Sequence, residues 1–384
     1  MMNLRKELQS LLSEDLASAQ KRAQVYLDER LPDGRPVALF GAGNIGKETA
    51  RRLVKTGIRP VAFIDDTPEK KGTLVEGIPV MPATDAIKAY GKDLSVVVTI
   101  LNPAHDFAKT EQRFCDLFGI LPISFMGLAW KWPDVFKGMH GVTHPVATLE
   151  KGNQILTFFD LLEDDASKQV YLDELKFRLI LDFSVLPPKE EPAYFPHSLS
   201  LGLKKPFIFV DAGAYDGDTV MALCDYADPS KIEKIIAFEP DPKNFSKLEK
   251  VCASKGLTDI SQCYQAALGG KPGTLRFNAT GDMSAALSSY GAIEVPVKTL
   301  MDTLPQADNI YIKFDIEGAE EEAITAAHPF MKKHRPTMAI SVYHKPEDLW
   351  NIGLELNALQ VGYKFFMRNH GVDGTDVICY AIPG

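Results

Sequence analysis

Three apolar, strand-like segments in the second half of the chain each end in an acidic side chain. The acidic residues are Asp211, Glu239 and Asp315. In an open α/β sheet, ligands bind outside the carboxyl ends of the strands, so we expect these side chains at one edge of a sheet. Carboxylates at that edge can accept hydrogen bonds from ribose hydroxyls and attract a positive charge. The pattern therefore predicts a nucleoside-type ligand that carries a positive charge.

The turn after the first of these strands is built for close approach of a ligand. Gly213 and Gly217 carry no side chain, and Ala214 and Tyr215 lie between them. Asp218 follows at the start of a predicted helix and is a residue type that favours the N-cap position. S-adenosylmethionine has both the ribose hydroxyls and the sulfonium charge that such a site would select, and it is the expected cofactor.

The second acidic residue, Glu239, comes 28 residues after Asp211, which is about the length of a βαβ unit. Its carboxylate can accept hydrogen bonds from both ribose hydroxyls. Asp241 and Pro242 then have the types expected for the cap and the first turn of a helix. A loop at residues 282–284, after the third strand region, could cover the adenine. The expected cofactor-binding residues are Asp211, Gly213, Ala214, Tyr215, Gly217, Glu239, Pro240, Asp282, Met283 and Asp315.

These residues lie in motifs that are shared with a known family. From about Tyr194 to Tyr380 the chain resembles the FkbM-type methyltransferases, which use S-adenosylmethionine to methylate mainly sugar or polyketide hydroxyls. The family's first motif usually has asparagine where this chain has Tyr215, so a side-chain contact there does not carry over. The motifs that carry the resemblance are Asp211–Gly217 (D-x-G-A-x-x-G), Phe238–Pro240 (F-E-P), Val297–Asp302 (V-K-T-L-M-D) and Lys313–Glu320 (K-x-D-I-E-G-x-E).

Transfer of a methyl group to a hydroxyl requires alignment of the reactants and removal of the hydroxyl proton. The candidate catalytic residues are Asp315, Glu317 and His344. If the third strand continues through residue 317, both carboxylates point to the same side. His344 follows the strand-like segment Met338–Tyr343, and it either serves this site or caps the next helix. A Mg²⁺ ion at Asp315 and Glu317 is conceivable, but two carboxylates are too few to define a site, so no metal ligand is assigned.

A second glycine-rich motif lies near the N-terminus. It follows the apolar segment Val37–Phe40, and an acidic residue comes 19 positions after the last glycine, as in dinucleotide-binding units. The segments Asp65–Pro68 and Gly77–Val80 resemble the nucleotide-sugar-binding domain of sugar acyltransferases. A nucleotide sugar, NAD and an empty scaffold all stay open for this unit. The candidate nucleotide site comprises Gly41, Gly43, Asn44, Ile45, Gly46 and Asp65.

The order of the patterns predicts an α/β protein with two Rossmann-like doubly wound sheets. The expected organisation is an N-terminal helix (1–35), a Rossmann-like nucleotide-binding domain (36–125), a helical connector and linker (126–192) and a methyltransferase domain (193–384). The last domain should have the seven-stranded class I methyltransferase sheet with an antiparallel edge hairpin. Tyr194 and Phe195, at the end of the linker, either pack against it or cover the cofactor.

Composition restricts the partners and the compartment. The net charge of −9 argues against nucleic acid or an anionic membrane as a partner. The five cysteines form no C-x-x-C pair, which favours a reduced, cytoplasmic chain. No apolar run approaches the roughly 20 residues of a membrane span. We expect a small-molecule or glycan acceptor, and nothing in the sequence indicates an oligomeric state.

Three functions from different classes are compatible with these patterns. The leading hypothesis is an S-adenosylmethionine-dependent O-methyltransferase that acts on a sugar, sugar-nucleotide or polysaccharide hydroxyl. An NAD-dependent oxidoreductase would use Gly43 and Asp65, but the first domain has no Tyr-x-x-x-Lys arrangement. A non-catalytic nucleotide-sugar-binding protein is the third alternative, and Tyr215 in the first motif leaves room for it.

Overall fold

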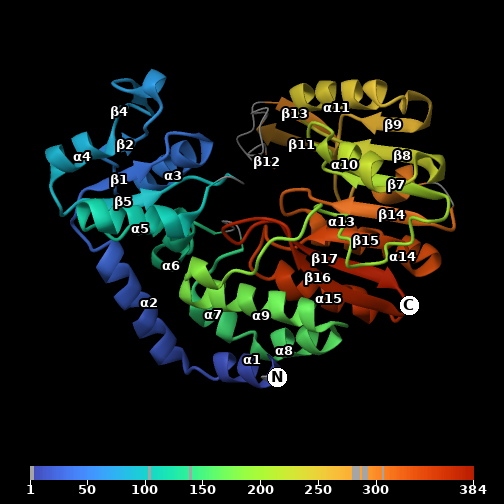
Figure 1. Ribbon diagram of the computed structural model, residues 1–384, viewed down its shortest axis with the longest axis horizontal. Coiled ribbons are helices and arrows are strands. Elements are labelled where there is room, and N and C mark those ends of the chain that lie inside the picture. The colour runs from blue at the N-terminus through green and yellow to red at the C-terminus, as the bar shows by residue number, and fades with distance from the viewer. Residues whose placement is uncertain (1–3, 103–104, 138–140, 279–285, 288–292, 305–306) are drawn as a thin grey trace. The chain divides into compact units, whose positions relative to one another are not determined.

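The computed structural model of the chain describes all residues except 1–3, 103–104, 138–140, 279–285, 288–292 and 305–306 (Figure 1). The chain divides into two compact units. The first comprises Met1–Leu156, Tyr171–Pro187 and Gly371–Thr375, and the second comprises Thr157–Val170, Pro188–His370 and Asp376–Gly384. Within the described residues, every helix is too short or too polar to cross a membrane.

The first unit contains a six-stranded sheet with the order β3-β4-β2-β1-β5-β6. All of its strand pairs are parallel except β3 with β4. The strands are β1 Val37–Phe40, β2 Ala62–Ile64, β3 Leu74–Val75, β4 Ile78–Met81, β5 Ser95–Val98 and β6 Ile123–Ser124. The helices that alternate with them are α3 Asn44–Lys55, α4 Ala83–Tyr90 and α5 Phe107–Phe118. This is the predicted Rossmann-like alternation, and β1 and β5 are buried along their whole length, as expected for central parallel strands.

The predicted N-terminal helix is broken in two, and so is a helical stretch within the predicted connector. Residues 4–31 form α1 Leu4–Leu12 and α2 Leu16–Arg30, because Asp15 between them accepts a 3.0 Å hydrogen bond from Ser18 N–H and caps α2. Residues 158–181 are broken by Asp164, whose carboxylate accepts a 2.7 Å bond from Ser167 N–H. The helices in this part of the chain are α6 Leu128–Lys131, α7 Pro145–Leu149, α8 Gly152–Leu161 and α9 Asp165–Ile180.

The second unit is built on a seven-stranded sheet with the order β16-β17-β15-β14-β7-β8-β9. Strand β17 runs antiparallel to both of its neighbours, and the other pairs are parallel. The predicted seven-stranded methyltransferase sheet with an antiparallel edge hairpin is therefore confirmed. Its strands are β7 Phe207–Ala212, β8 Ile232–Phe238, β9 Ser261–Tyr264, β14 Ile310–Phe314, β15 Thr337–Ser341, β16 Tyr363–Asn369 and β17 Val377–Pro383.

The helices of this unit follow the strands in sequence. The strand order reverses around β7 and β14. These strands are neighbours, although their paired residues Ile208 and Ile310 lie 102 positions apart in the sequence. Such a reversal is where open α/β sheets bind their ligands. The helices are α10 Asp218–Tyr226, α11 Pro242–Ser254, α12 Leu300–Thr303, α13 Glu320–Ala326, α14 His328–His334 and α15 Asp348–Ala358.

A smaller sheet is inserted in the chain between β9 and β14. Its order is β10-β13-β11-β12, and β11 pairs antiparallel with β13. The strands are β10 Ala267–Leu268, β11 Gly273–Asn278, β12 Ala286–Leu287 and β13 Ile293–Lys298. The predicted adenine-covering residues Asp282 and Met283 lie outside the described residues.

Phe195 lies in the hydrophobic core of the second unit. Its side chain is fully buried, and its ring centroid lies 5.9 Å from that of Phe209 and 5.7 Å from that of Tyr311. The idea that Phe195 covers the cofactor is therefore wrong. Burial of its large apolar ring stabilises the fold, because burying a phenylalanine side chain contributes about 1.5–3 kcal/mol to the free energy of folding.

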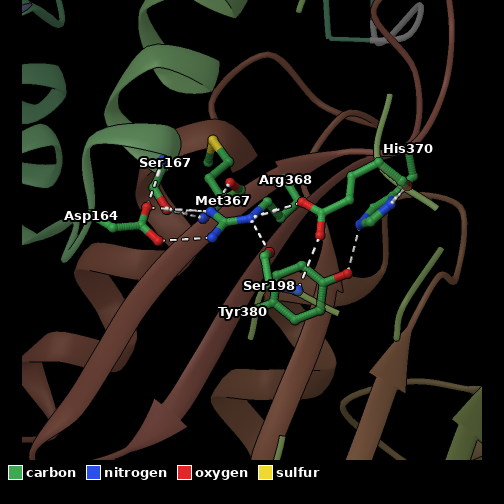
Figure 2. A network of polar contacts seen from close by, with 8 residues as sticks. Asp164, Ser167, Ser198, Met367, Arg368, His370 and Tyr380 are labelled. Atoms are coloured by element: carbon green, nitrogen blue, oxygen red, sulfur yellow. Dashed lines mark hydrogen bonds and ion pairs between the residues drawn. The ribbon is translucent and has the colours of Figure 1, made fainter. Parts of the chain in front are cut away.

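A buried arginine fastens the linker to the sheet (Figure 2). Arg368 on β16 is 4% exposed, and its guanidinium donates at 2.8 Å to Asp164 Oδ2 and at 2.9 Å to the hydroxyls of Ser167 and Ser198. Its Nε also lies 3.1 Å from Glu190 Oε2. In the same network, His370 Nε2 lies 2.7 Å from the Tyr380 hydroxyl (Figure 2). The segment that leads into β7 is thus held by charge-assisted bonds to the edge hairpin.

Candidate active site

The turn after β7 is fixed by close backbone packing. Gly213 has φ +85°, and a Cβ there would lie 1.9 Å from the carbonyl oxygen of Asp315. The N–H groups of Gly213 and Ala214 donate to Phe238 O at 3.1 and 2.9 Å. This position therefore needs glycine because the ends of β7, β8 and β14 meet at it.

The start of α10 differs from the prediction in one detail. Gly217, with φ +93°, is the N-cap, and Asp218 is the first helical residue. The Asp218 carboxylate accepts a 2.7 Å bond from the neighbouring Thr219 N–H, so Asp218 is not the N-cap that the sequence suggests. The turn needs a left-handed residue at 217, and glycine adopts that conformation more easily than aspartate.

Asp211 lies beneath this turn and pairs with a lysine. Its side chain is fully buried, and Lys313 Nζ lies 3.1 Å from its Oδ1. Lys313 also donates to the carbonyl oxygen of Gly213. Burial raises the pKa of Asp211, although Lys313 opposes the shift. Asp211 and Lys313 therefore hold the turn in shape from inside the sheet, and Ala214, which is also fully buried, offers only its backbone to a ligand.

Glu239 organises the second strand end. One carboxylate oxygen accepts a 2.9 Å bond from Tyr215 N–H, and the other accepts a 2.7 Å bond from Asp241 N–H. Asp241 in turn caps α11 through Lys243 N–H at 2.8 Å, as predicted. Glu239 is 5% exposed, and burial raises its pKa to about 7. Each of its oxygens can accept a further hydrogen bond.

Four side chains meet after β14 and β15: Asp315, Glu317, Glu320 and His344, which we call the carboxylate–imidazole cluster. His344 Nδ1 lies 2.9 Å from Glu320 Oε1, and His344 Nε2 lies 3.4 Å from Asp315 Oδ1 and 3.8 Å from Glu317 Oε2. Glu320 is fully buried at the start of α13, and its Oε1 accepts a 2.8 Å bond from Ile316 N–H. The structure thus brings all three predicted catalytic residues together.

Asp315 and Glu317 do not come together by the predicted route, which was an extended strand through residue 317. Strand β14 ends at Phe314, and Glu317 has φ +56°, so residues 315–317 form a turn and not an extended strand. The turn carries Glu317 back toward His344. Helix α15 begins at Asp348 with Glu347 as its N-cap, so the alternative that His344 caps this helix is wrong.

Two tyrosine hydroxyls orient Asp315. Tyr194 donates to Oδ2 at 2.8 Å, and Tyr343 donates to Oδ1 at 3.4 Å. Burial works to raise the pKa of Asp315, but the charges of Lys313 and His344 and the hydroxyl donors outweigh it and hold this pKa below its usual value. Asp315 is therefore an ionised, oriented carboxylate at neutral pH.

The members of the cluster differ in pKa because each has a different balance of burial and neighbouring charge. Burial alone would lower the pKa of His344, but the charges of Glu320, Glu317 and Asp315 outweigh it and raise this pKa to about 10. Desolvation raises the pKa of Glu317 to about 7, against the opposing effect of His344. The side chain of Glu317 is nevertheless 38% exposed, the largest exposed fraction in the cluster. Glu317 is thus a carboxylate that can both reach solvent and exchange a proton near neutral pH.

Several residues of this site were not assigned a role from the sequence. Glu320 and Lys313 lie in the K-x-D-I-E-G-x-E motif, and a lysine inside an apolar strand is a signal that a buried acid needs a partner. Tyr343 carries no comparable signal, because an aromatic residue at a strand end is most often part of the core.

The N-terminal glycine motif has a similar local geometry in the first unit. Asp65 accepts bonds of 3.0 Å from Ala42 N–H and from Thr67 N–H, and Lys70 Nζ lies 2.8 Å away. These donors lower the pKa of Asp65 to about 2, although burial opposes them. A Cβ on Gly46 would lie 2.1 Å from Gly41 O, so helix–strand packing by itself requires that glycine. Of the remaining candidates, Gly43 is the exposed N-cap of α3, and Asn44 and Ile45 form its first turn.

Comparison with known proteins gives a match to a domain family and matches to solved structures. Residues 211–370 match the methyltransferase FkbM domain. The structure is similar to methyltransferase FkbM from Methylobacillus flagellatus KT, with a TM-score of 0.72 at 20% sequence identity over 96% of this chain and 99% of that chain. At that identity the match shows a shared fold. No curated protein matches the chain.

Two further solved structures are similar over about half of this chain. An rRNA methylase from Streptococcus thermophilus has a TM-score of 0.30 at 12% identity and covers 47% of this chain and 87% of that chain. A ribosomal protein L11 methylase from Lactobacillus delbrueckii subsp. bulgaricus has a TM-score of 0.29 at 14% identity and covers 46% of this chain and 69% of that chain. TM-scores this low carry no conclusion about activity.

The sheet order, the strand-end carboxylates and the domain match together define an S-adenosylmethionine-dependent methyltransferase. Within that class, residues 211–370 are similar to the methyltransferase FkbM domain, as the motifs in this region suggest.

Proposed function

We propose that this protein is an O-methyltransferase that acts on a hydroxyl of a sugar, a sugar nucleotide or a polysaccharide precursor in the cytoplasm. The observation that carries the proposal is the convergence of Asp315, Glu317 and His344 at the strand ends, where the partly exposed Glu317 carboxylate lies beside the ionised Asp315. A base whose pKa lies near neutrality is well suited to remove a proton from a hydroxyl.

The residues around the first turn fit an adenosyl cofactor. Glu239 keeps acceptor capacity for two ribose hydroxyls while its present bonds hold the turn. The turn from Gly213 to Gly217 contacts Glu239 through Tyr215 N–H, and Pro240 follows Glu239 in the chain. S-adenosylmethionine, when bound, supplies a methyl group on a positively charged sulfur. Asp315 and Glu239 provide negative charge that suits such a cation.

The chain's own residues would then handle the hydroxyl. Methyl transfer to oxygen depends chiefly on alignment, and Asp315, fixed by the hydroxyls of Tyr194 and Tyr343, can hold an acceptor hydroxyl by accepting its hydrogen bond. Glu317 takes the proton. His344, within 3.8 Å of both carboxylates, keeps them in place.

A polyhydroxylated acceptor suits this set of polar groups. Two tyrosine hydroxyls and two carboxylates at one strand end offer several hydrogen-bond partners to a sugar. The family resemblance points to the same acceptor class. We also propose that the glycine motif of the first unit binds a nucleotide or nucleotide sugar, which requires Lys70 to leave Asp65.

The test is transfer of labelled methyl from S-adenosylmethionine to a panel of sugar nucleotides and soluble polysaccharides. The proposal expects a labelled acceptor whose methyl group resists base hydrolysis, as an ether does, and whose formation requires Glu317. Nicotinamide-dependent oxidation of the same panel, lost in Asp65→Ala, would support the oxidoreductase alternative. Cofactor binding with no transfer to any acceptor would support a non-catalytic binding protein.

A further inference from the structure

We propose that Asp315, Glu320 and His344 bind a divalent first-row transition-metal ion. The proposed site rests on the proposed function for its role, which is to polarise the acceptor hydroxyl, but its existence is tested separately. It replaces the weaker idea of Mg²⁺ at Asp315 and Glu317, which lacked a third ligand.

The three donors lie close to the separations that one ion would need. One ligand atom from each of Asp315, Glu320 and His344 can be chosen so that all lie within 4.8 Å of one another. With metal–ligand bonds of about 2.0–2.2 Å, donor atoms in a filled site lie about 3–4.4 Å apart. Shifts of a few tenths of an ångström would therefore complete the coordination.

Buried atoms without hydrogen bonds point independently to a ligand. Glu320 is fully buried, and within the part of the chain that the structure describes its Oε2 has no hydrogen-bond partner. Among the same residues, neither ring nitrogen of His344 makes a hydrogen bond of good geometry, although Nδ1 lies 2.9 Å from Glu320 Oε1. Leaving a buried carboxylate oxygen unsatisfied is unfavourable, so a bound ion would relieve the penalty.

The balance of charge in the cluster also favours a cation. Three carboxylates, those of Asp315, Glu317 and Glu320, surround one imidazole. Lys313, the next cation in the sheet, is already paired with Asp211. A dication would neutralise two of the three carboxylates, whereas a proton on His344 neutralises one. Metal binding would therefore displace that proton.

The donor set indicates which metals fit. Mg²⁺ and Ca²⁺ prefer sites made only of oxygen, whereas imidazole is a good ligand for Fe²⁺, Co²⁺, Ni²⁺ and Zn²⁺, and Mn²⁺ accepts carboxylate-rich sites. Two carboxylates and one histidine leave positions free for an acceptor hydroxyl. Coordination would lower the pKa of that hydroxyl. Glu317 lies outside the three ligands and can take its proton.

The experiment titrates chelator-treated, full-length protein with Mn²⁺ and follows free Mn²⁺ by electron paramagnetic resonance. We expect one site per chain, and binding at least tenfold weaker in Glu320→Gln and His344→Gln. The matched control is Glu322→Gln, which removes an exposed carboxylate from the same helix and should leave binding unchanged. No stoichiometric binding, or equal binding by all variants, would overturn the proposal.

A second measurement on the unmodified protein guards against variants that fail to fold. Spin-echo modulation of bound Mn²⁺ should show coupling to a directly coordinated nitrogen, which only His344 among the three ligands can provide. Bound Mn²⁺ without that coupling would overturn the assignment. Calorimetric titration with S-adenosylmethionine is run in parallel on the metal-free protein. Cofactor binding with no metal site would reject only the metal, and a metal site with no cofactor binding would reject the proposed function.

Discussion

The carbonyl oxygen of Asp315 occupies the space in which a side chain at Gly213 would begin, 1.9 Å from the position of a Cβ. The first and third strand ends therefore pack backbone against backbone. The turn that would bind the cofactor packs directly against the turn that carries the candidate base, so a change in either turn should affect both.

Gly213→Ala tests this coupling. The φ of +85° costs an L-residue about 1–2 kcal/mol, and relief of the overlap adds about 1–3 kcal/mol of strain. Denaturant unfolding should show a loss of about 2–5 kcal/mol, together with weaker cofactor binding. Gly273→Ala is the control, because a Cβ there meets nothing within 4 Å. Equal stability of the two variants would contradict the packing.

The Asp211–Lys313 pair should be strongly coupled. Both side chains are at most 3% exposed, so Lys313→Met leaves a buried, unpaired carboxylate and should cost about 3–5 kcal/mol. The double variant Asp211→Asn/Lys313→Met should recover part of that loss. Additive losses in a double-mutant cycle, measured by unfolding, would show that the two groups do not interact.

Methyl transfer should depend on the ionisation of Glu317. With a pKa raised to about 7 by desolvation, Glu317 is protonated below that pH and cannot accept a proton. The apparent second-order rate constant should therefore fall about tenfold per pH unit below pH 7 and level off above it. Glu317→Gln should lose about 10²–10⁴-fold in rate while cofactor affinity changes little. A flat profile from pH 5.5 to 8 would argue against Glu317 as the base.

Removal of the buried Arg368 should loosen the linker. Arg368→Gln breaks contacts to Asp164 and Glu190 and should cost about 2–4 kcal/mol in the free energy of unfolding. Lys109→Gln breaks an exposed pair with Asp106 and should cost less than about 0.5 kcal/mol. Comparable losses of stability in the two variants would mean that the network around Arg368 stabilises the fold no more than an exposed ion pair does.

Much of this arrangement could be predicted from the sequence, because local patterns specify it. Apolar runs that end in Asp211, Glu239 and Asp315 give the strands and their ligand edge, and Asp241 with Pro242 marks a helix start that the structure confirms. These features depend on residues close in sequence, where propensity and pattern act directly.

The features that sequence reasoning missed depend on tertiary contacts. The turn at Glu317 has positive φ, which nothing in its residue type suggests. Glu320 takes its role from a 2.9 Å approach to His344, 24 positions further along the chain. Phe195 could be placed in the core only once Phe209 and Tyr311 were seen to enclose it.

The central claim is that the strand-end carboxylates of the second unit hold an adenosyl sulfonium, and calorimetric titration with S-adenosylmethionine tests it most directly. We expect one site per chain, and binding at least tenfold weaker in Glu239→Ala, whose carboxylate would contact the ribose. Asp66→Ala, which removes an exposed carboxylate from the first unit, should bind as the unmodified protein does. Absence of binding, or equal affinity in the two variants, would contradict the account.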